Sequence, residues 1–81
     1  MSVHVTFYSF FRDLTGVAET TAALPPDSRL SDLQEQLFAR YPQLRPMQKS
    51  MLLAVGVDYQ KPDFLLRDQD QVALFPPVQG G

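Results

Sequence analysis

The side chains of catalytic types in this 81-residue sequence are not arranged in any familiar catalytic motif. It has no cysteine, and its one histidine, His4, has no acidic partner near it in sequence. The serines belong to no nucleophile-elbow motif, and the four glycines form no phosphate-binding loop. Asp68 and Asp70 lack the further oxygen ligands that a calcium loop places at alternate positions, so they indicate a turn. We therefore expect no metal site and none of the familiar catalytic sets.

The group that remains as a candidate for chemistry is the C-terminal carboxylate. It belongs to Gly81, which Gly80 precedes. At an average glycine usage of about 7 %, such a pair ends roughly 1 in 200 chains by chance, so alone it is a weak indicator. Glycine has no side chain to block a narrow channel, and its backbone adopts whatever angles that channel imposes. Pro76 and Pro77 favour an extended stem at low entropic cost. The pattern fits a carboxylate that reacts inside the active site of another protein.

Composition limits the remaining classes of function. The length allows one domain, and 44 % apolar and 20 % charged residues are ordinary for a globular protein. A net charge of −2, with scattered Lys and Arg, argues against nucleic acid as the main partner. The longest apolar run, residues 51–57, is too short to span a bilayer, and the N-terminus lacks a signal-peptide pattern. We expect a cytoplasmic protein that binds neither nucleic acid nor membranes.

The N-terminal half predicts two strands and one helix. Val3, Val5 and Phe7 alternate with polar residues, which indicates a strand with one face on a core. Residues 9–16 break the alternation, Gly16 can supply a turn, and residues 17–24 read as a weaker edge strand.

The helix follows as the best-defined element. Apolar residues at helical spacing between Leu30 and Tyr41 predict about three turns. Ser31 and Gln34 fit a capping box, and Pro42 ends the helix.

The C-terminal half predicts three strands and a tail. Residues 44–50 form a loop, and residues 51–55 form a strand that is covered on both faces. A short strand follows around Tyr59, and residues 71–75 form the last strand. The sequence thus predicts an α+β domain over residues 1–75, a sheet packed on one main helix, and a flexible extended tail over residues 76–81.

Two segments resemble a known family. Residues 66–81 contain paired aspartates, a hydrophobic strand, Phe-Pro-Pro-Val and a terminal Gly-Gly. They resemble the C-terminal signature of the small, sulfur-carrying subunits of molybdopterin synthase. Residues 7–16 are similar to that family's opening strand and Arg-acid-Leu turn. The resemblance covers essentially the whole chain and implies a mixed-sheet β-grasp (ubiquitin-like) fold.

The sequence departs from the family pattern at two positions. The family usually has Gly where Gln69 stands. Either the backbone there needs a positive φ, in which case a non-glycine residue costs about 1 kcal/mol, or the turn type differs. It often has Asn where Gly56 stands, and both residues tolerate a left-handed conformation. Neither position lies in the tail.

The resemblance implies a sequence of reactions at Gly81. An activating enzyme that uses ATP and Mg adenylates its carboxylate, and a sulfur donor protein converts it to a thiocarboxylate. The sulfur then passes to a cyclic pyranopterin precursor and forms the molybdopterin dithiolene. The large synthase subunit would supply the catalytic side chains, in a heterotetramer of two small and two large subunits. This chain would be the non-catalytic small subunit, with no cofactor of its own, and Pro76, Pro77, Val78 and Gly80 would insert with Gly81.

Docking requires a surface around the root of the tail. We expect Phe7, Phe11, Arg12 and Phe75 at this interface, because exposed aromatic residues and arginine suit interface centres. The alternative for Phe7 and Phe75 is a place in the core.

Three other functions remain open. The thiazole-forming sulfur carriers of thiamine synthesis share the fold and the Gly-Gly end, although they are usually shorter and lack the Phe-Pro-Pro-Val stem. A ubiquitin-like modifier would join Gly81 to lysines of other proteins. A plain interaction domain would keep its function without Gly81.

Overall fold

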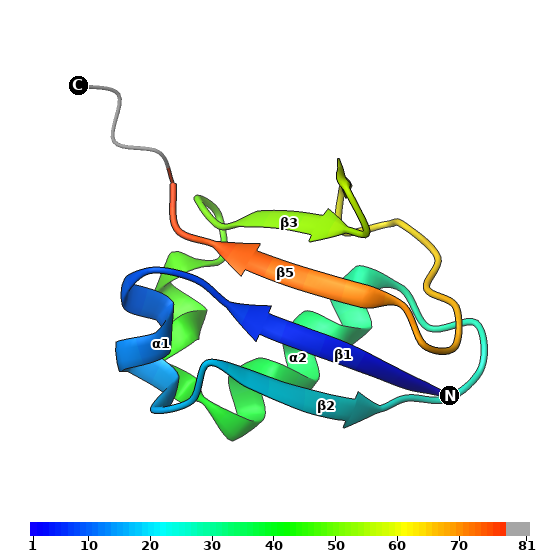
Figure 1. Ribbon diagram of the computed structural model, residues 1–81, viewed down its shortest axis with the longest axis horizontal. Helices are drawn as coiled ribbons and strands as arrows, with labels where there is room; N and C mark the ends of the chain where they lie inside the picture. Colours follow the sequence, from blue (N-terminus) through cyan, green and yellow to red (C-terminus); the bar gives the residue numbers. More distant parts are fainter. Residues whose placement is uncertain (78–81) are drawn as a thin grey trace.

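The computed structural model describes residues 1–77 as one five-stranded sheet with a long helix across one face (Figure 1). The strand order is β2-β1-β5-β3-β4. The elements are β1 (Ser2–Phe7), α1 (Phe10–Thr15), β2 (Glu19–Ala23), α2 (Leu30–Arg40), the 3-10 helix η1 (Pro42–Met47), β3 (Leu52–Val55), β4 (Asp58–Tyr59) and β5 (Gln71–Phe75). This mixed α+β architecture confirms the predicted β-grasp fold.

The sheet joins the two ends of the sequence at its centre. β1 pairs with β5 in parallel, with His4 opposite Gln71 and Phe7 opposite Leu74. The other pairings, β1 with β2, β3 with β5 and β3 with β4, are antiparallel. β2 lies at an edge, as its weaker pattern predicted. Because β5 lies between β1 and β3, the chain leaves the sheet from an interior strand.

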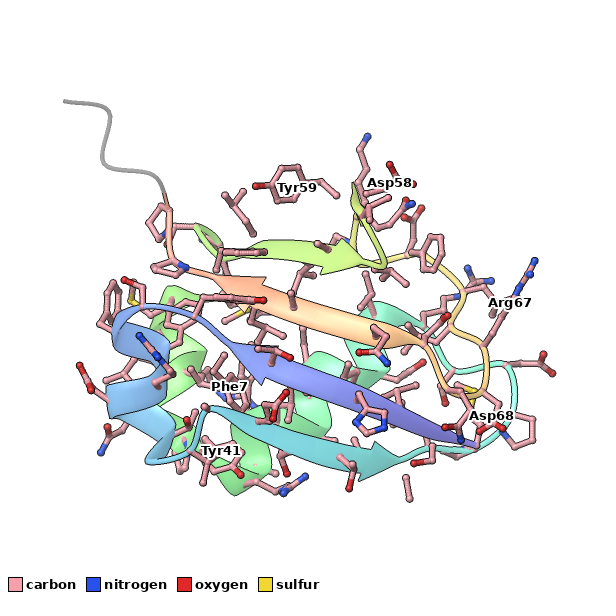
Figure 2. The ribbon with its side chains drawn as sticks, viewed as in Figure 1. Phe7, Tyr41, Asp58, Tyr59, Arg67 and Asp68 are labelled. Carbon is pink, nitrogen blue, oxygen red and sulfur yellow. The ribbon has the colours of Figure 1, made fainter. Side chains whose placement is uncertain are left out.

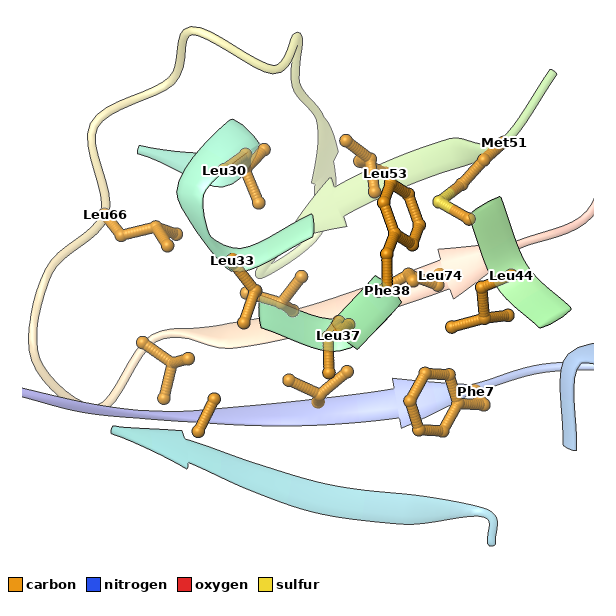
Figure 3. Close-up of a cluster of buried hydrophobic side chains, with 14 of the residues drawn as sticks. Phe7, Leu30, Leu33, Leu37, Phe38, Leu44, Met51, Leu53, Leu66 and Leu74 are labelled. Atoms are coloured by element: carbon orange, nitrogen blue, oxygen red, sulfur yellow. The ribbon is translucent and has the colours of Figure 1, made fainter. Parts of the chain in front are cut away.

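The core lies between the sheet and α2 (Figure 3). Alternate residues of β1 and β5 point toward the helix, whose apolar stripe covers them. Leu53 and Ala54 of β3 point in opposite directions and both are buried, Leu53 in the core beside α2 and Ala54 on the opposite face, where no second layer of described elements covers the sheet, although the sequence had predicted cover on both faces. The largest fully buried side chains include Phe7, Phe11, Phe38, Leu30, Leu33, Leu37, Leu44 and Leu74.

The segment after β1 contains a helix that the sequence did not predict. Residues 9–16 are not a simple turn, because α1 occupies Phe10–Thr15. Ser9 starts it with φ 58° and ψ −138°, a combination that is otherwise nearly restricted to glycine. Gly16 ends the helix with φ 79°, and its N–H donates to the Arg12 carbonyl at 2.8 Å. A six-residue helix is too short to produce a clear helical period, so the sequence pattern shows only that the strand alternation ends.

Both ends of α2 differ in detail from the sequence prediction. The helix begins at Leu30, and the backbone N–H of Arg29 donates to Asp32 Oδ2 at 2.8 Å. The capping box predicted at Ser31 and Gln34 is therefore wrong: Ser31 lies inside the helix, and Gln34 is buried. Pro42 does follow the end of the helix, but it opens η1 where a loop was expected. Proline suits the first turn of a helix, where its missing N–H has no partner.

The turn before β5 holds the N-terminus of β1. The Ser2 N–H donates to Asp68 Oδ1 at 2.7 Å, and the Gln69 N–H donates to the Ser2 carbonyl. The Arg67 N–H donates to Asp70 Oδ2 at 2.8 Å, which confirms the aspartates as turn formers. Gln69 has φ 69°, so the position does need the left-handed conformation that glycine adopts without strain.

Asp68 should make the stability of the fold depend on pH. The Ser2 N–H lowers the pKa of the Asp68 carboxyl below its ordinary value. A lowered pKa in the folded state stabilises the protein above the ordinary pKa, and this contribution disappears as the pH falls through the folded pKa. We expect Asp68→Ala to destabilise the protein near neutral pH and to destabilise it less at about pH 3, because the stabilisation by the carboxylate declines as the pH falls below the ordinary pKa of 3.8. Urea unfolding at both pH values measures the difference, and a pH-independent difference would contradict the assignment.

Candidate functional site

The root of the tail lies at the end of an interior strand. β5 ends at Phe75, and Pro76 and Pro77 continue outside the sheet, half-buried. The reactive residue predicted from sequence, Gly81, lies outside the described residues, as do Val78 and Gly80. The division into a domain over residues 1–75 and a tail over residues 76–81 therefore stays a prediction.

An aromatic patch surrounds this root on the face of the sheet opposite α2. We define it as Tyr8, Val57, Tyr59 and Phe75. The rings of Tyr8 and Phe75 stack at 4.5 Å with an interplanar angle of 8°, and Tyr59 meets Phe75 edge-on at 6.2 Å. The patch and the small residues Ala54, Gly56 and Ala73 line a shallow hollow of about 280 Å³.

The patch residues are exposed to solvent although they are apolar or aromatic. Val57 is 97 % exposed, Tyr59 67 % and Tyr8 44 %, while Phe75 is half-buried beneath its two aromatic neighbours. Figure 2 shows Tyr59 lying outside the β3 edge. Exposed aromatic groups beside a half-buried one are typical of the centres of protein interfaces.

Two of the four interface residues predicted from sequence are wrong. Phe7 and Phe11 are 1 % and 0 % exposed, so their side chains offer no surface to a partner. Phe7 packs edge-on against Tyr41 at 5.6 Å, inside the core (Figure 2). The alternation in the sequence could have predicted this burial, because Phe7 points to the same face of the strand as the buried Val3 and Val5. The next residue, Tyr8, therefore points to the open face of the sheet, which is the face opposite α2. Tyr8, Val57 and Tyr59 are the residues that the sequence reasoning missed.

The other two predicted interface residues are accessible. Phe75 belongs to the aromatic patch, next to the tail. Arg12 is exposed on α1. Phe10, which is close to Arg12 in sequence, is 41 % exposed and packs against Phe11 at 5.2 Å, so one of these two consecutive aromatic residues faces solvent. The role of Arg12 and Phe75 at an interface stays a prediction.

The rest of the described chain contains little that could act as a catalytic centre. His4 is exposed on β1, apart from the tail root. Within residues 1–77, no group of three His, Asp or Glu side chains is placed to hold a metal ion. In the same residues, no helix is both long and apolar enough to span a membrane.

The fold, with the root of the tail at the end of an interior strand, defines a ubiquitin-like β-grasp domain. Comparisons with known proteins identify the family within this class. A model of the ThiS family matches residues 5–81, so the chain belongs to the ThiS family. A molybdopterin synthase sulfur carrier subunit from Chlamydomonas reinhardtii is 32 % identical over 83 residues, which span 100 % of both sequences.

Comparison with solved structures also finds proteins of this kind. A putative molybdopterin converting factor subunit 1 from Pyrococcus furiosus matches with a TM-score of 0.88 at 31 % identity, over 96 % of this chain and 99 % of that one. A chain in the complex of subunits 1 and 2 of the molybdopterin-converting factor from Helicobacter pylori shares the fold, with a TM-score of 0.70 at 21 % identity and full coverage of both chains.

The corrected site predicts different effects of two aromatic substitutions on stability. Phe7→Ala removes a fully buried ring and should lower the free energy of unfolding by about 3–5 kcal/mol. Tyr59→Ala removes a largely exposed ring and should change it by about 0.5 kcal/mol or less. Urea denaturation of both variants measures the difference. Equal losses would show that Tyr59 is part of the core, which would contradict its assignment to a surface patch.

Proposed function

We propose that this chain is the sulfur-carrier subunit of a molybdopterin synthase in the cytoplasm. The observation that carries the proposal is the match over the full length to relatives of that name, which includes the terminal Gly-Gly. The site supports it as well. The described residues contain an accessible patch at the root of the tail and no evident catalytic constellation, as suits a protein whose own terminus is the reactant.

The first reaction would activate the carboxylate of Gly81. A carboxylate is a poor electrophile, so an activating enzyme would join it to the AMP portion of ATP, with Mg as the metal of that enzyme, and release pyrophosphate. Sulfur delivered at the sulfide level by a donor protein would then attack the acyl carbon, forming a C–S bond as the acyl–phosphate bond breaks; AMP leaves, and Gly81 carries a thiocarboxylate. Gly80 leaves the acyl carbon accessible, because neither terminal residue has a side chain.

The second reaction would take place on the large synthase subunit. Pro76, Pro77 and Val78 would guide the tail into its active site. The thiocarboxylate sulfur would attack a carbon of the cyclic pyranopterin precursor and displace an oxygen substituent, and water would then cleave the resulting thioester, which leaves the sulfur on the precursor and returns Gly81 to its carboxylate form. Two such transfers build the dithiolene, which agrees with a heterotetramer of two small and two large subunits. Because Phe75 precedes the stem directly, a partner that receives the tail would also cover the aromatic patch.

Thiocarboxylate formation tests the first reaction. We expect the intact mass of the chain, incubated with the activating enzyme, ATP, Mg and a sulfur donor, to show exchange of one oxygen for sulfur. The chain without Gly81 should show no exchange, although it folds with the same circular dichroism spectrum. Lack of exchange in the full-length chain would refute the carrier role. Rescue of a molybdopterin-deficient strain, but not of a thiazole-deficient strain, would separate the two sulfur-carrier pathways.

Binding to the large subunit tests the patch. Tyr59→Glu places a charge in the expected interface centre and should weaken binding about tenfold or more, by calorimetry with the purified large subunit. Val17→Glu is the matched control, because Val17 is an exposed apolar residue outside the patch. Its affinity should stay near that of the unaltered chain. Equal affinities for the two variants would show that the patch is not the docking surface.

A further inference from the structure

The aromatic patch encloses a floor of small residues on interior strands of the sheet. Ala73 of β5 pairs with Ala54 of β3, and Ala54 pairs with Tyr59 of β4. Alanine is depleted in strands, because its side chain packs little surface against its neighbours. Two paired alanines at this position therefore contribute little to the stability of the sheet. Their small size instead leaves the hollow of about 280 Å³ open on the face opposite α2.

Gly56 continues this floor beyond the end of β3. Its φ of 63° and the hydrogen bond of 2.9 Å from its N–H to the Gln71 carbonyl belong to the turn between β3 and β4. A Cβ atom added to Gly56 would meet no atom within 4 Å from any described residue beyond its two chain neighbours. The turn explains the choice of glycine, and the space beside it is part of the hollow.

The lining of the hollow has a uniform chemical character. Its described residues are the four members of the aromatic patch and the three small residues Ala54, Gly56 and Ala73, and none of them is charged. A charged group would lose hydration there without gaining an ionic partner. The volume is also slightly below the range of about 300–1,000 Å³ that is typical of small-molecule sites. The hollow therefore suits one apolar side chain better than an ion or a cofactor.

The rim of the hollow is already shaped before a partner arrives. The Phe75 ring stacks on Tyr8 at 4.5 Å and meets Tyr59 edge-on at 6.2 Å. Val57, 97 % exposed at the turn, extends the apolar surface beyond these rings. Hot-spot side chains at interfaces fill desolvated pockets, and the groups around such a pocket exclude water. The aromatic patch provides such a surrounding, and Phe75 connects it directly to the stem of the tail.

We propose that the hollow is the socket for one aliphatic side chain, of leucine or isoleucine size, from the large synthase subunit. The inference rests on the proposed function, because it names the group of that partner which meets the aromatic patch. Ala54 and Ala73 contact the end of this side chain, the three rings surround it, and Val57 covers it from the turn. The contact holds the carrier beside its tail, so that the affinity does not depend on the terminal glycines.

Substitutions at Ala73 test the socket by filling it from within. Ala73→Val and Ala73→Leu keep the patch apolar, but their side chains occupy the space that the partner needs. By calorimetry with the purified large subunit, we expect affinity losses of about fivefold for Ala73→Val and about twentyfold for Ala73→Leu. Gln71→Leu is the matched control, because Gln71 is exposed on the same face of β5 and lies outside the hollow. Its affinity should stay near that of the unaltered chain.

The two filling variants distinguish a socket from a flat contact. Ala73→Leu adds apolar area to the patch, so a partner that lies flat on it would bind this variant at least as tightly as the unaltered chain. That result, with folding checked by urea denaturation, would overturn the proposal. Ala73→Val keeps the comparison valid if the larger variant does not fold, because valine suits a strand.

Titration of the isolated, isotope-labelled chain separates the socket from the proposed function, because it requires no partner protein. The probe is N-acetyl-leucinamide, and the controls are N-acetyl-alaninamide, which is too small to fill the hollow, and N-acetyl-argininamide, which is charged. We expect saturable shifts of the Ala54 and Ala73 methyl signals with the leucine probe alone. No saturable shift with this probe, or equal shifts with the arginine probe, would overturn the socket even if Gly81 forms a thiocarboxylate. Saturable shifts in a chain that forms no thiocarboxylate would refute the carrier role and support the socket.

Discussion

The parallel pairing of β1 with β5 is the constraint on which the rest of the structure depends. It joins residues near the two ends of the sequence, with His4 opposite Gln71 and Phe7 opposite Leu74. The turn contacts of Asp68 and Gln69 with Ser2 fix its start, and the Tyr8 N–H, donating to the Leu74 carbonyl at 3.1 Å, extends it beyond β1. Because both strands run the same way, the end of β1 and the root of the tail meet at one end of the sheet (Figure 1).

This pairing also decides which aromatic residues form the site. Successive residues of a strand point to opposite faces, so Phe7 enters the core and Tyr8 reaches the open face. There the Tyr8 ring stacks on the Phe75 ring, and the Tyr59 ring meets Phe75 edge-on. Two aromatic rings therefore hold Phe75, the last residue before the prolines. A shift of one residue in register would exchange Phe7 and Tyr8 and remove the patch.

The sequence could predict the elements with long, regular patterns. The alternation in residues 3–7, the apolar stripe of α2 and the last strand all appear where expected. At Gln69 the sequence left two possibilities open, a positive φ or a different turn type, and the structure has the positive φ. The short helix α1 could not be predicted, because six residues give no clear helical period and the helix begins at the unusual backbone conformation of Ser9. The aromatic patch could not be predicted either, because Tyr8, Tyr59 and Phe75 are brought together by the order of the strands in the sheet and not by any local sequence pattern.

A tail that ends in two glycines makes the patch necessary for the proposed function. Fixing one residue of backbone costs about 1–2 kcal/mol, and glycine loses the most freedom of any residue. Gly80 and Gly81 have no side chains, so they bury little apolar surface to offset this cost inside a partner. The affinity must therefore come mainly from elsewhere on the chain. The aromatic patch is already ordered by ring stacking before a partner arrives, so its binding loses little side-chain entropy. In the proposed carrier, the reactive end and the binding surface are separate for this physical reason: the features that let Gly81 enter a narrow active site also deprive it of binding energy.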